Sequence, residues 1–223
     1  MRVLVMLGVL SLAAVAAAQE GTVAVPSAYK IQFENEWVKV TRVVYGPMAK
    51  LPPHAHTPLP AAYVYLNDGG PVRYKHIGGH GTVATRPATK AGAFRIYRGL
   101  DEVHAVENTA AVPSEFLRVE FKNTPGDLAT FKGKFERPAS ADGEQVHFDH
   151  TQMRATRVWV KPGESRQVAA TEPALLIALA NGVGMKVGQE RWLASGGTIT
   201  LTNTGTAPVD LLRFDLKTTP TTR

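Results

Sequence analysis

Two histidines separated by one residue, His54 and His56, are the first candidates for chemistry in this sequence. Side chains alternate in direction along a β-strand, so residues two apart project from the same face. Imidazole is a ligand for Zn, Fe, Cu and Ni, and two rings on one face can share an ion. A third histidine, His104, lies in a later stretch of strand-forming residues and is the remaining ligand candidate.

Tyrosine and arginine side chains are candidates for substrate binding. Tyr63 and Tyr65 share one face of an expected strand, and Arg95 and Tyr97 share a face of another. Such side chains could line a cavity and hold a polar substrate. We predict Tyr63, Tyr65 and Arg95 as substrate-binding candidates. The alternative is a half-exposed position on the outside of a β structure, which suits these residue types equally well.

The other histidines are weaker candidates. His76 and His80 flank a glycine-rich stretch, which favours a surface position for both. His147 and His150 are three residues apart on an expected strand, so they would face opposite sides. The sequence therefore favours surface positions over metal binding for His76 and His80, and it argues against a joint metal site of His147 and His150.

Short runs rich in Val, Ile, Tyr, Phe and Thr recur along the chain, separated by Gly, Pro, Asn and Asp. This spacing is typical of a β-sandwich or barrel. Beyond the first eighteen residues, no long stretch has the 3.6-residue apolar period of an amphipathic helix. The sequence therefore predicts an all-β fold. The expected strands include Trp37–Tyr45, Ala61–Leu66, Val72–His76, Ala93–Tyr97, Glu115–Phe121, Thr156–Val160, Leu175–Leu179, Thr198–Thr202 and Val209–Leu216.

Two segments recur in the same order, which predicts two similar halves. Residues 106–122 align without a gap with 201–217, and both stretches contain Asn-Thr, Pro, Leu-Arg and a final Lys. Near the start of each half, 41–47 matches 156–162. We predict one domain over 28–123, a connection rich in Pro, Gly and charges over 124–145, and a second domain over 146–218.

The motifs around the three histidines resemble those of the cupin superfamily. Its first motif has a glycine followed by H-x-H, here Gly46 and His54-Ala-His56. Its second motif has glycines, then a histidine and an asparagine, here Gly92, Gly99, His104 and Asn108. The resemblance covers residues 30–122 directly and extends to 217 through the repeat.

The resemblance implies two double-stranded β-helix (jelly-roll) barrels in tandem. It places His104 across the barrel from His54 and His56, and the three imidazoles would bind a divalent transition metal. The resemblance does not identify the metal, which could be iron, zinc, nickel, copper or manganese. Three protein ligands leave free positions on the ion, as in catalytic rather than structural sites.

The chain departs from the cupin pattern at the usual glutamate. That residue would fall three or four positions after His56, where this chain has Pro60 and Ala61. Glu102 lies two residues before His104 and would share its face on a regular strand, so Glu102 or a water could complete the coordination. The alternative, which the local sequence favours, is a solvated charge in a turn.

The second half lacks the histidines of the first. Aligning the halves places Ala169, Thr171 and Ile199 at the positions of His54, His56 and His104. The asparagine of the second motif is retained as Asn203. We therefore predict one metal site, in the first half, with the second half supplying packing or a lid.

The first eighteen residues predict a secretory signal peptide, with Arg2, an apolar run and small residues before Gln19. The run is shorter than the roughly 20 residues of a spanning helix, so we expect a periplasmic or secreted protein without a membrane anchor. The net charge of +6 is scattered, which argues against a nucleic-acid partner. The chain has no cysteine, which excludes disulfides and thiolate ligands.

These features predict a metal-dependent enzyme that acts on a small molecule in the first barrel, of dioxygenase, isomerase or lyase type. One alternative is a non-catalytic protein of the cell envelope that binds a small ligand. Another is a structural role in which the histidines hold no metal. Fusing two barrels could replace the pairing of single-barrel cupins, so both a monomer and a homodimer are compatible with the sequence.

Overall fold

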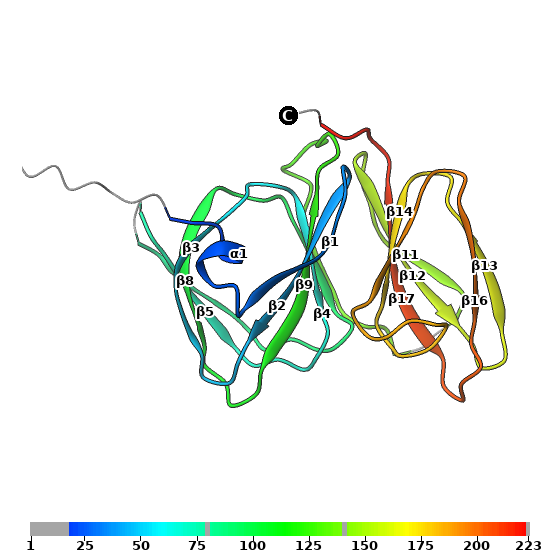
Figure 1. Cartoon of the computed structure of the whole chain (residues 1–223), viewed down its shortest axis with the longest axis horizontal. Helices are drawn as coiled ribbons and strands as arrows, with labels where there is room; N and C mark the ends of the chain where they lie inside the picture. Colours follow the sequence, from blue (N-terminus) through cyan, green and yellow to red (C-terminus); the bar gives the residue numbers. More distant parts are fainter. Residues whose placement is uncertain (1–17, 79–80, 140–141, 222–223) are drawn as a thin grey trace, which may run out of the picture.

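Nearly all of the regular secondary structure in the computed structural model is antiparallel β-strand, and the model describes residues 18–78, 81–139 and 142–221 (Figure 1). The all-β prediction is confirmed. No helix within these ranges is long and apolar enough to cross a membrane. The predicted signal peptide falls on residues 1–18, of which 1–17 lie outside the described ranges.

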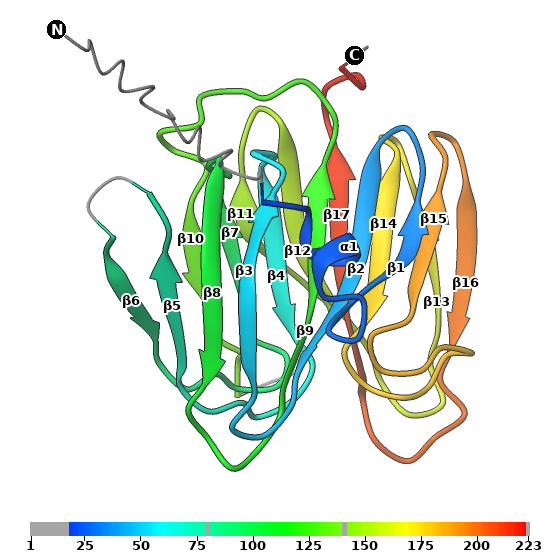
Figure 2. The same cartoon turned by 60° about the vertical axis from the view of Figure 1, so that its left-hand side comes forward.

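Two facing sheets form the first barrel (Figure 2). The larger has the strand order β1-β2-β9-β4-β7-β10, and the smaller has the order β3-β8-β5-β6. The elements are α1 (Gly21–Ala24), β1 (Tyr29–Glu34), β2 (Val38–Tyr45), β3 (Lys50–His56), β4 (Ala61–Tyr65), β5 (Val72–His76), β6 (Val83–Arg86), β7 (Phe94–Tyr97), β8 (Glu102–Asn108), β9 (Ser114–Phe121) and β10 (Gly133–Phe135).

The two faces of β9 explain how this barrel obtains a polar interior. Arg118 and Glu120 point into the barrel, where they contact residues near the end of β3. Val119 and Phe121 alternate with them and belong to the apolar core on the opposite face of the sheet. One strand thus separates a charged interior from a packed core.

The second barrel repeats this plan with sheets ordered β11-β12-β17-β14-β15 and β13-β16. Its order β11-β12-β17-β14 matches β1-β2-β9-β4, and the first strand of each barrel carries a β-bulge, between Ile31 and Phe33 and between Val146 and Phe148. The elements are β11 (Glu144–Asp149), β12 (Met153–Val160), β13 (Ser165–Ala169), β14 (Ala174–Ala178), β15 (Glu190–Leu193), β16 (Thr198–Thr202) and β17 (Val209–Leu216).

The asparagine retained in both halves has the same structural role in each. Asn108 Nδ2 donates to the carbonyl of Val112 at 2.9 Å, and Asn203 Nδ2 donates to the carbonyl of Ala207 at 2.8 Å. In both cases the amide bridges the turn that follows the strand. This residue therefore holds a turn, which explains why it is present in a half without the histidines.

The two barrels pack together through their larger sheets and share one apolar core. Phe121 of β9 and Phe214 of β17 lie there with their ring centroids 5.5 Å apart. Beside this core, Arg157 Nη1 is 2.7 Å from Asp210 Oδ2, and neither side chain is exposed. Arg157 Nη2 also donates to the carbonyl of Gly92 at 2.5 Å, which ties the second barrel to the first.

The stretch 124–145, for which the sequence predicts a connection, contains β10 and the start of β11. Strand β10 pairs with β7 at Lys134 and Arg95, and Phe135 stacks on Phe94 with centroids 4.7 Å apart. Phe131 is fully buried in the shared core. The aromatic residues of this stretch draw it onto the first sheet because their apolar surface requires burial.

Candidate metal centre

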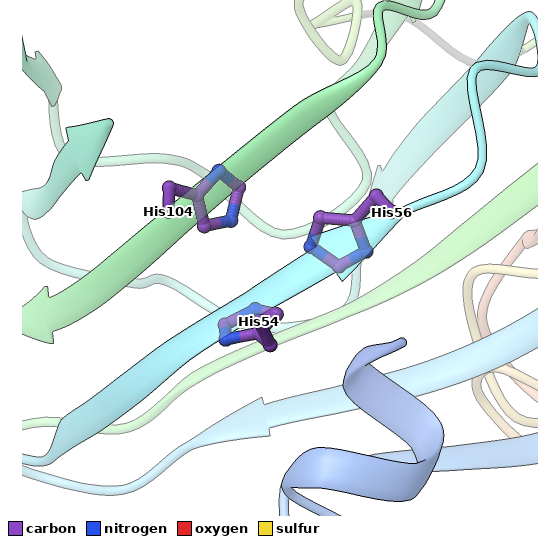
Figure 3. Close-up of side chains that lie close together, drawn as sticks. All are labelled: His54, His56 and His104. Atoms are coloured by element: carbon purple, nitrogen blue, oxygen red, sulfur yellow. The ribbon is translucent and has the colours of Figure 1, made fainter. Parts of the chain in front are cut away.

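Three histidines from two neighbouring strands meet inside the first barrel (Figure 3). His54 and His56 lie on β3 and His104 on β8, and their ring centroids are 4.9 to 5.0 Å apart in all three pairs. All three are buried. Each offers a nitrogen, and these atoms lie within 4.8 Å of one another. The structure thus brings the three predicted ligands together.

His104 does not lie across the barrel from the other two, so that implication of the resemblance is wrong. Strands β3 and β8 are neighbours in the smaller sheet, and His54 is directly opposite His104 in their register. Opposed side chains on antiparallel strands have Cβ atoms about 5 Å apart. Strand pairing therefore brings the rings together, in a register that a bulge between Leu51 and His54 sets.

Hydrogen bonds fix the orientation of His54. Its Nδ1 donates to the carbonyl of Pro52 at 2.9 Å, because a carbonyl can only accept. Its Nε2 is therefore an acceptor, and it receives the hydroxyl of Tyr29 at 2.7 Å. An outer hydrogen bond such as the one from Nδ1 to Pro52 orients a ligand and raises its basicity. It leaves Nε2 as the nitrogen of His54 that could bind an ion, and an ion would have to displace the Tyr29 hydroxyl from it.

The segment that precedes β1 closes one side of the cluster. A Cβ added at Gly21, in α1, would lie 3.1 Å from His54 Cδ2 and 3.4 Å from His56 Cε1. The amide of Ala55 donates to the carbonyl of Gln19 at 2.8 Å, which holds this segment against β3. A ligand must therefore reach the histidines from another side.

A buried guanidinium lies beside His56. Arg118 Nη1 donates to His56 Nδ1, and its Nη2 donates to the carbonyl of Thr57 at 3.0 Å. Burial and Arg118 together lower the pKa of His56 far below its ordinary value, and burial also lowers the pKa of His54. Both rings are therefore neutral at neutral pH, which is the form that binds a metal.

His104 is the least satisfied member of the cluster. Both of its ring nitrogens are buried, and neither has a hydrogen-bond partner among the described residues. Buried polar atoms are nearly always paired, and an unpaired one in a native structure can indicate an ion. The two unpaired nitrogens therefore fit the role of a metal ligand.

Glu102 and His76 lie at the edge of the cluster, whereas the sequence favours a solvated turn for Glu102 and the surface for His76. Glu102 begins β8, so it shares a face with His104, and its Oε1 is 3.7 Å from His104 Nδ1. Its Oε2 is 3.7 Å from His76 Nδ1. Burial raises the pKa of Glu102, but His104 and His76 lower it further, so the carboxyl is ionised. With His104 these residues form a second group that could hold an ion.

A cavity of about 370 Å³ adjoins the cluster and is lined by His56 and His104. Tyr63, Tyr65 and Arg95, the substrate-binding candidates, also line it. The Arg95 guanidinium carbon lies 5.4 Å from the ring centroid of Tyr63. The structure thus places these three side chains where a substrate could contact them, and their role in binding stays a prediction.

Four further residues of the site were missed by reasoning from the sequence, namely Tyr29, Tyr74, Arg86 and Arg118. One signal could have identified Arg118: it alternates with apolar residues along β9, as Glu120 does, which indicates a strand with one polar face turned inward. Tyr74 carries a similar signal, because it alternates with the exposed Arg73 and Lys75 along β5. Tyr29 and Arg86 lie on strands whose exposed and buried positions do not alternate regularly.

The second barrel has no comparable cluster, since both groups that could hold a metal in the described ranges lie in the first barrel. In the first barrel His54 is paired with His104. In the second barrel the residue paired with Ile199 is Val168, not Ala169. The ungapped alignment of the two halves, which pairs His54 with Ala169, is therefore shifted by one residue here. The reason is that the bulge in β3 adds a residue that β13 lacks. Val168 is buried in an apolar core, whereas Ala169 and Thr171 are exposed.

The lowered pKa values of His54 and His56 predict a pH dependence for the metal-free protein. The folded state holds both rings neutral, and the unfolded chain protonates them below about pH 6.5. The unfolded state thus binds more protons, so stability is lost as the pH falls, by up to about 1.4 kcal/mol per pH unit for each ring. Urea unfolding at a series of pH values would measure this slope, and a His54→Gln, His56→Gln variant should lack it. An equal slope in that variant would assign the effect to other groups.

No protein-family model and no curated protein sequence matches the chain. Solved structures do match it. The bacterial pirin YhhW from Escherichia coli, in complex with nickel(II), has a TM-score of 0.59 at 15% identity, over 86% of this chain and 91% of its own. A vicilin from Solanum melongena has 0.56 at 10% identity, over 86% and 83%.

A variant of oxalate decarboxylase OxdC from Bacillus subtilis has a TM-score of 0.50 at 12% identity, over 87% of this chain and 77% of its own. Identities this low show the fold alone. These proteins are cupins, and two-barrel cupins are among the matching structures. The matches cover both barrels, because each extends over more than four fifths of the chain. This chain therefore has the cupin fold, built as two barrels in tandem, as its histidine motifs and internal repeat predict.

Proposed function

We propose that the protein binds a divalent transition metal through His54, His56 and His104 and uses it to act enzymatically on a small organic molecule. One observation carries the proposal: three buried imidazoles form a cluster beside a cavity of about 370 Å³ that His56 and His104 line, and both ring nitrogens of His104 lack a partner among the described residues. A purely structural ion would not need a cavity beside it.

The donor set fits such a metal. Three imidazole nitrogen ligands suit iron, zinc, nickel or copper better than magnesium or calcium. Three protein ligands leave coordination positions free, so a bound ion would supply a Lewis acid next to the cavity. The nickel(II) complex of the pirin YhhW supports metal binding in a barrel of this fold.

The protein's own side chains would position a substrate beside this ion. Tyr63 and Arg95 offer a hydroxyl and a cation from the larger sheet, opposite the strands that carry the histidines. The ionised Glu102 adjoins His104, where it can accept a proton or a hydrogen bond from its ring. We assign Glu102 to orienting His104.

Elemental analysis of the purified protein, followed by an activity screen, tests the proposal. We expect about one transition-metal ion per chain, before or after reconstitution. Oxygen uptake and product formation would then be followed across a panel of small acids, thiols and sugars. Protein without stoichiometric metal after reconstitution would exclude the metal site. Metal-loaded protein that binds ligands but converts none would instead identify a binding protein.

A further inference from the structure

Arg86 is a buried cation without an anionic partner among the described residues. It is the last residue of β6, and 9% of its surface is exposed. Its Nη2 donates to the hydroxyl of Ser114 at 2.6 Å, whereas its Nε is buried and has no acceptor in the described part of the chain. The side chain lines the same cavity as His104.

The neighbours of Arg86 reduce the cost of its burial but do not neutralise it. Its guanidinium carbon lies 5.1 Å from the ring centroid of Tyr65 and 5.4 Å from that of Phe116. Aromatic faces attract a cation, but they offer neither a negative charge nor an acceptor in the plane of the guanidinium. A buried charge is costly unless it is paired. An anion in the cavity would supply both the missing charge and the missing acceptor.

The other charges on the cavity wall leave this anion position free. Glu102 is engaged by His104 and His76, and Glu136 is exposed. Arg118 is paired with Glu120 and Lys90 with Asp68, whereas Arg95 and Lys134 add positive charge to the wall. An organic acid would therefore enter a cavity whose buried end carries a single unpaired cation.

The rest of the wall is aromatic. Every tyrosine of the chain lines this one cavity, together with two phenylalanines. Flat rings bind a flat apolar body, and their hydroxyls can bond polar substituents on it. Inorganic anions and aliphatic polyacids would leave most of this aromatic surface without contact. The tyrosines are Tyr29, Tyr45, Tyr63, Tyr65, Tyr74 and Tyr97.

We infer that the cavity binds a small aromatic carboxylate, with its carboxylate on Arg86 and its ring among the tyrosines. The inference rests on the proposed function, since it names the substrate class of the same site. Arg86 determines specificity here and is not a metal ligand. Because His104 and Arg86 line the same cavity, a ligand bound to Arg86 would lie in the cavity that adjoins the proposed metal site.

Calorimetric titration with benzoate tests the inference, on protein stripped with a chelator and on metal-loaded protein. Benzamide serves as the neutral analogue and acetate as the anion without a ring. We expect benzoate to bind at least about 10-fold more tightly than either, since both the charge-assisted hydrogen bonds and the ring contacts are needed. Benzamide or acetate binding as tightly as benzoate would overturn the inference.

Arg86→Met should weaken benzoate binding by at least about 10-fold and leave the metal content unchanged. The matched control is Arg73→Met, which removes an exposed arginine from the neighbouring strand β5. The thermal midpoint of Arg86→Met should stay level or rise, because an unpaired buried charge is removed. A lower midpoint with unchanged benzoate binding would show that Arg86 serves only the fold.

The two proposals fail in different ways. Stoichiometric metal in a protein that does not bind benzoate would overturn the assignment of the aromatic carboxylate and leave the metal site standing. Benzoate binding that depends on Arg86 in a protein without metal would support the carboxylate site and overturn the proposed function. Should Arg86→Met fail to fold, the comparison of benzoate with benzamide on the natural protein still decides.

Discussion

Replacing His104 with alanine is expected to remove stoichiometric metal binding from the protein. His104 is the one member of the cluster that β8 supplies, so its loss leaves two imidazoles on β3 alone. Changes to residues that merely orient a ligand already cost about 10- to 100-fold in metal affinity, and loss of the ligand itself should cost more than about 100-fold. Elemental analysis after dialysis, and titration against a competing chelator, would measure the loss.

The control for this experiment is His150→Ala, a histidine of the second barrel that lies outside both candidate metal groups. The free energy of unfolding of metal-free His104→Ala should be close to that of the metal-free natural protein, because the ring nitrogens removed have no hydrogen-bond partner among the residues that the structure describes. Full metal content in His104→Ala would mean that the ion is held elsewhere. An equal loss in His150→Ala would show that metal content reports general damage.

The sequence predicts the cluster of three histidines but not the strand pairing that brings them together. The one-residue spacing of His54 and His56 is enough to place them on one face, because alternation in a strand is local. The pairing of His54 with His104 depends on a bulge in β3, and no local sequence pattern predicts the extra residue that forms this bulge. The same bulge displaces the alignment of the halves by one residue at Val168.

Arg86 shows why the cavity could not be predicted in the same way. It ends a four-residue edge strand whose other three residues are exposed, so the local pattern indicates a solvated hairpin. Its burial comes from Tyr65 and Phe116, which lie on strands of the opposite sheet. Contacts between sheets are tertiary, and a single sequence carries no local record of them. The polar face of β9 is the exception, because Arg118 and Glu120 alternate with apolar residues.

Replacing Asp210 with alanine is expected to destabilise the protein by about 3–5 kcal/mol. The replacement leaves Arg157 as a buried, unpaired charge between the barrels. Neither side chain is exposed, and the Nε of Arg157 and the Oδ1 of Asp210 already lack partners within the described ranges. Arg157 also holds the carbonyl of Gly92, two residues before β7 and its cavity residue Arg95. Urea unfolding would measure the loss. The exposed partner Arg137 gives the control, since Arg137→Ala should cost less than about 1 kcal/mol.

The double replacement Arg157→Met, Asp210→Leu should recover most of that stability. Burial raises the pKa of Asp210 despite its arginine partners, and burial lowers the pKa of Arg157 despite Asp210. Both shifts have the sign expected when the cost of desolvating the pair exceeds its attraction. The pair therefore contributes little net stability, although either charge left alone is costly. A double variant as unstable as Asp210→Ala would show instead that the bond from Arg157 to Gly92 is what joins the two barrels.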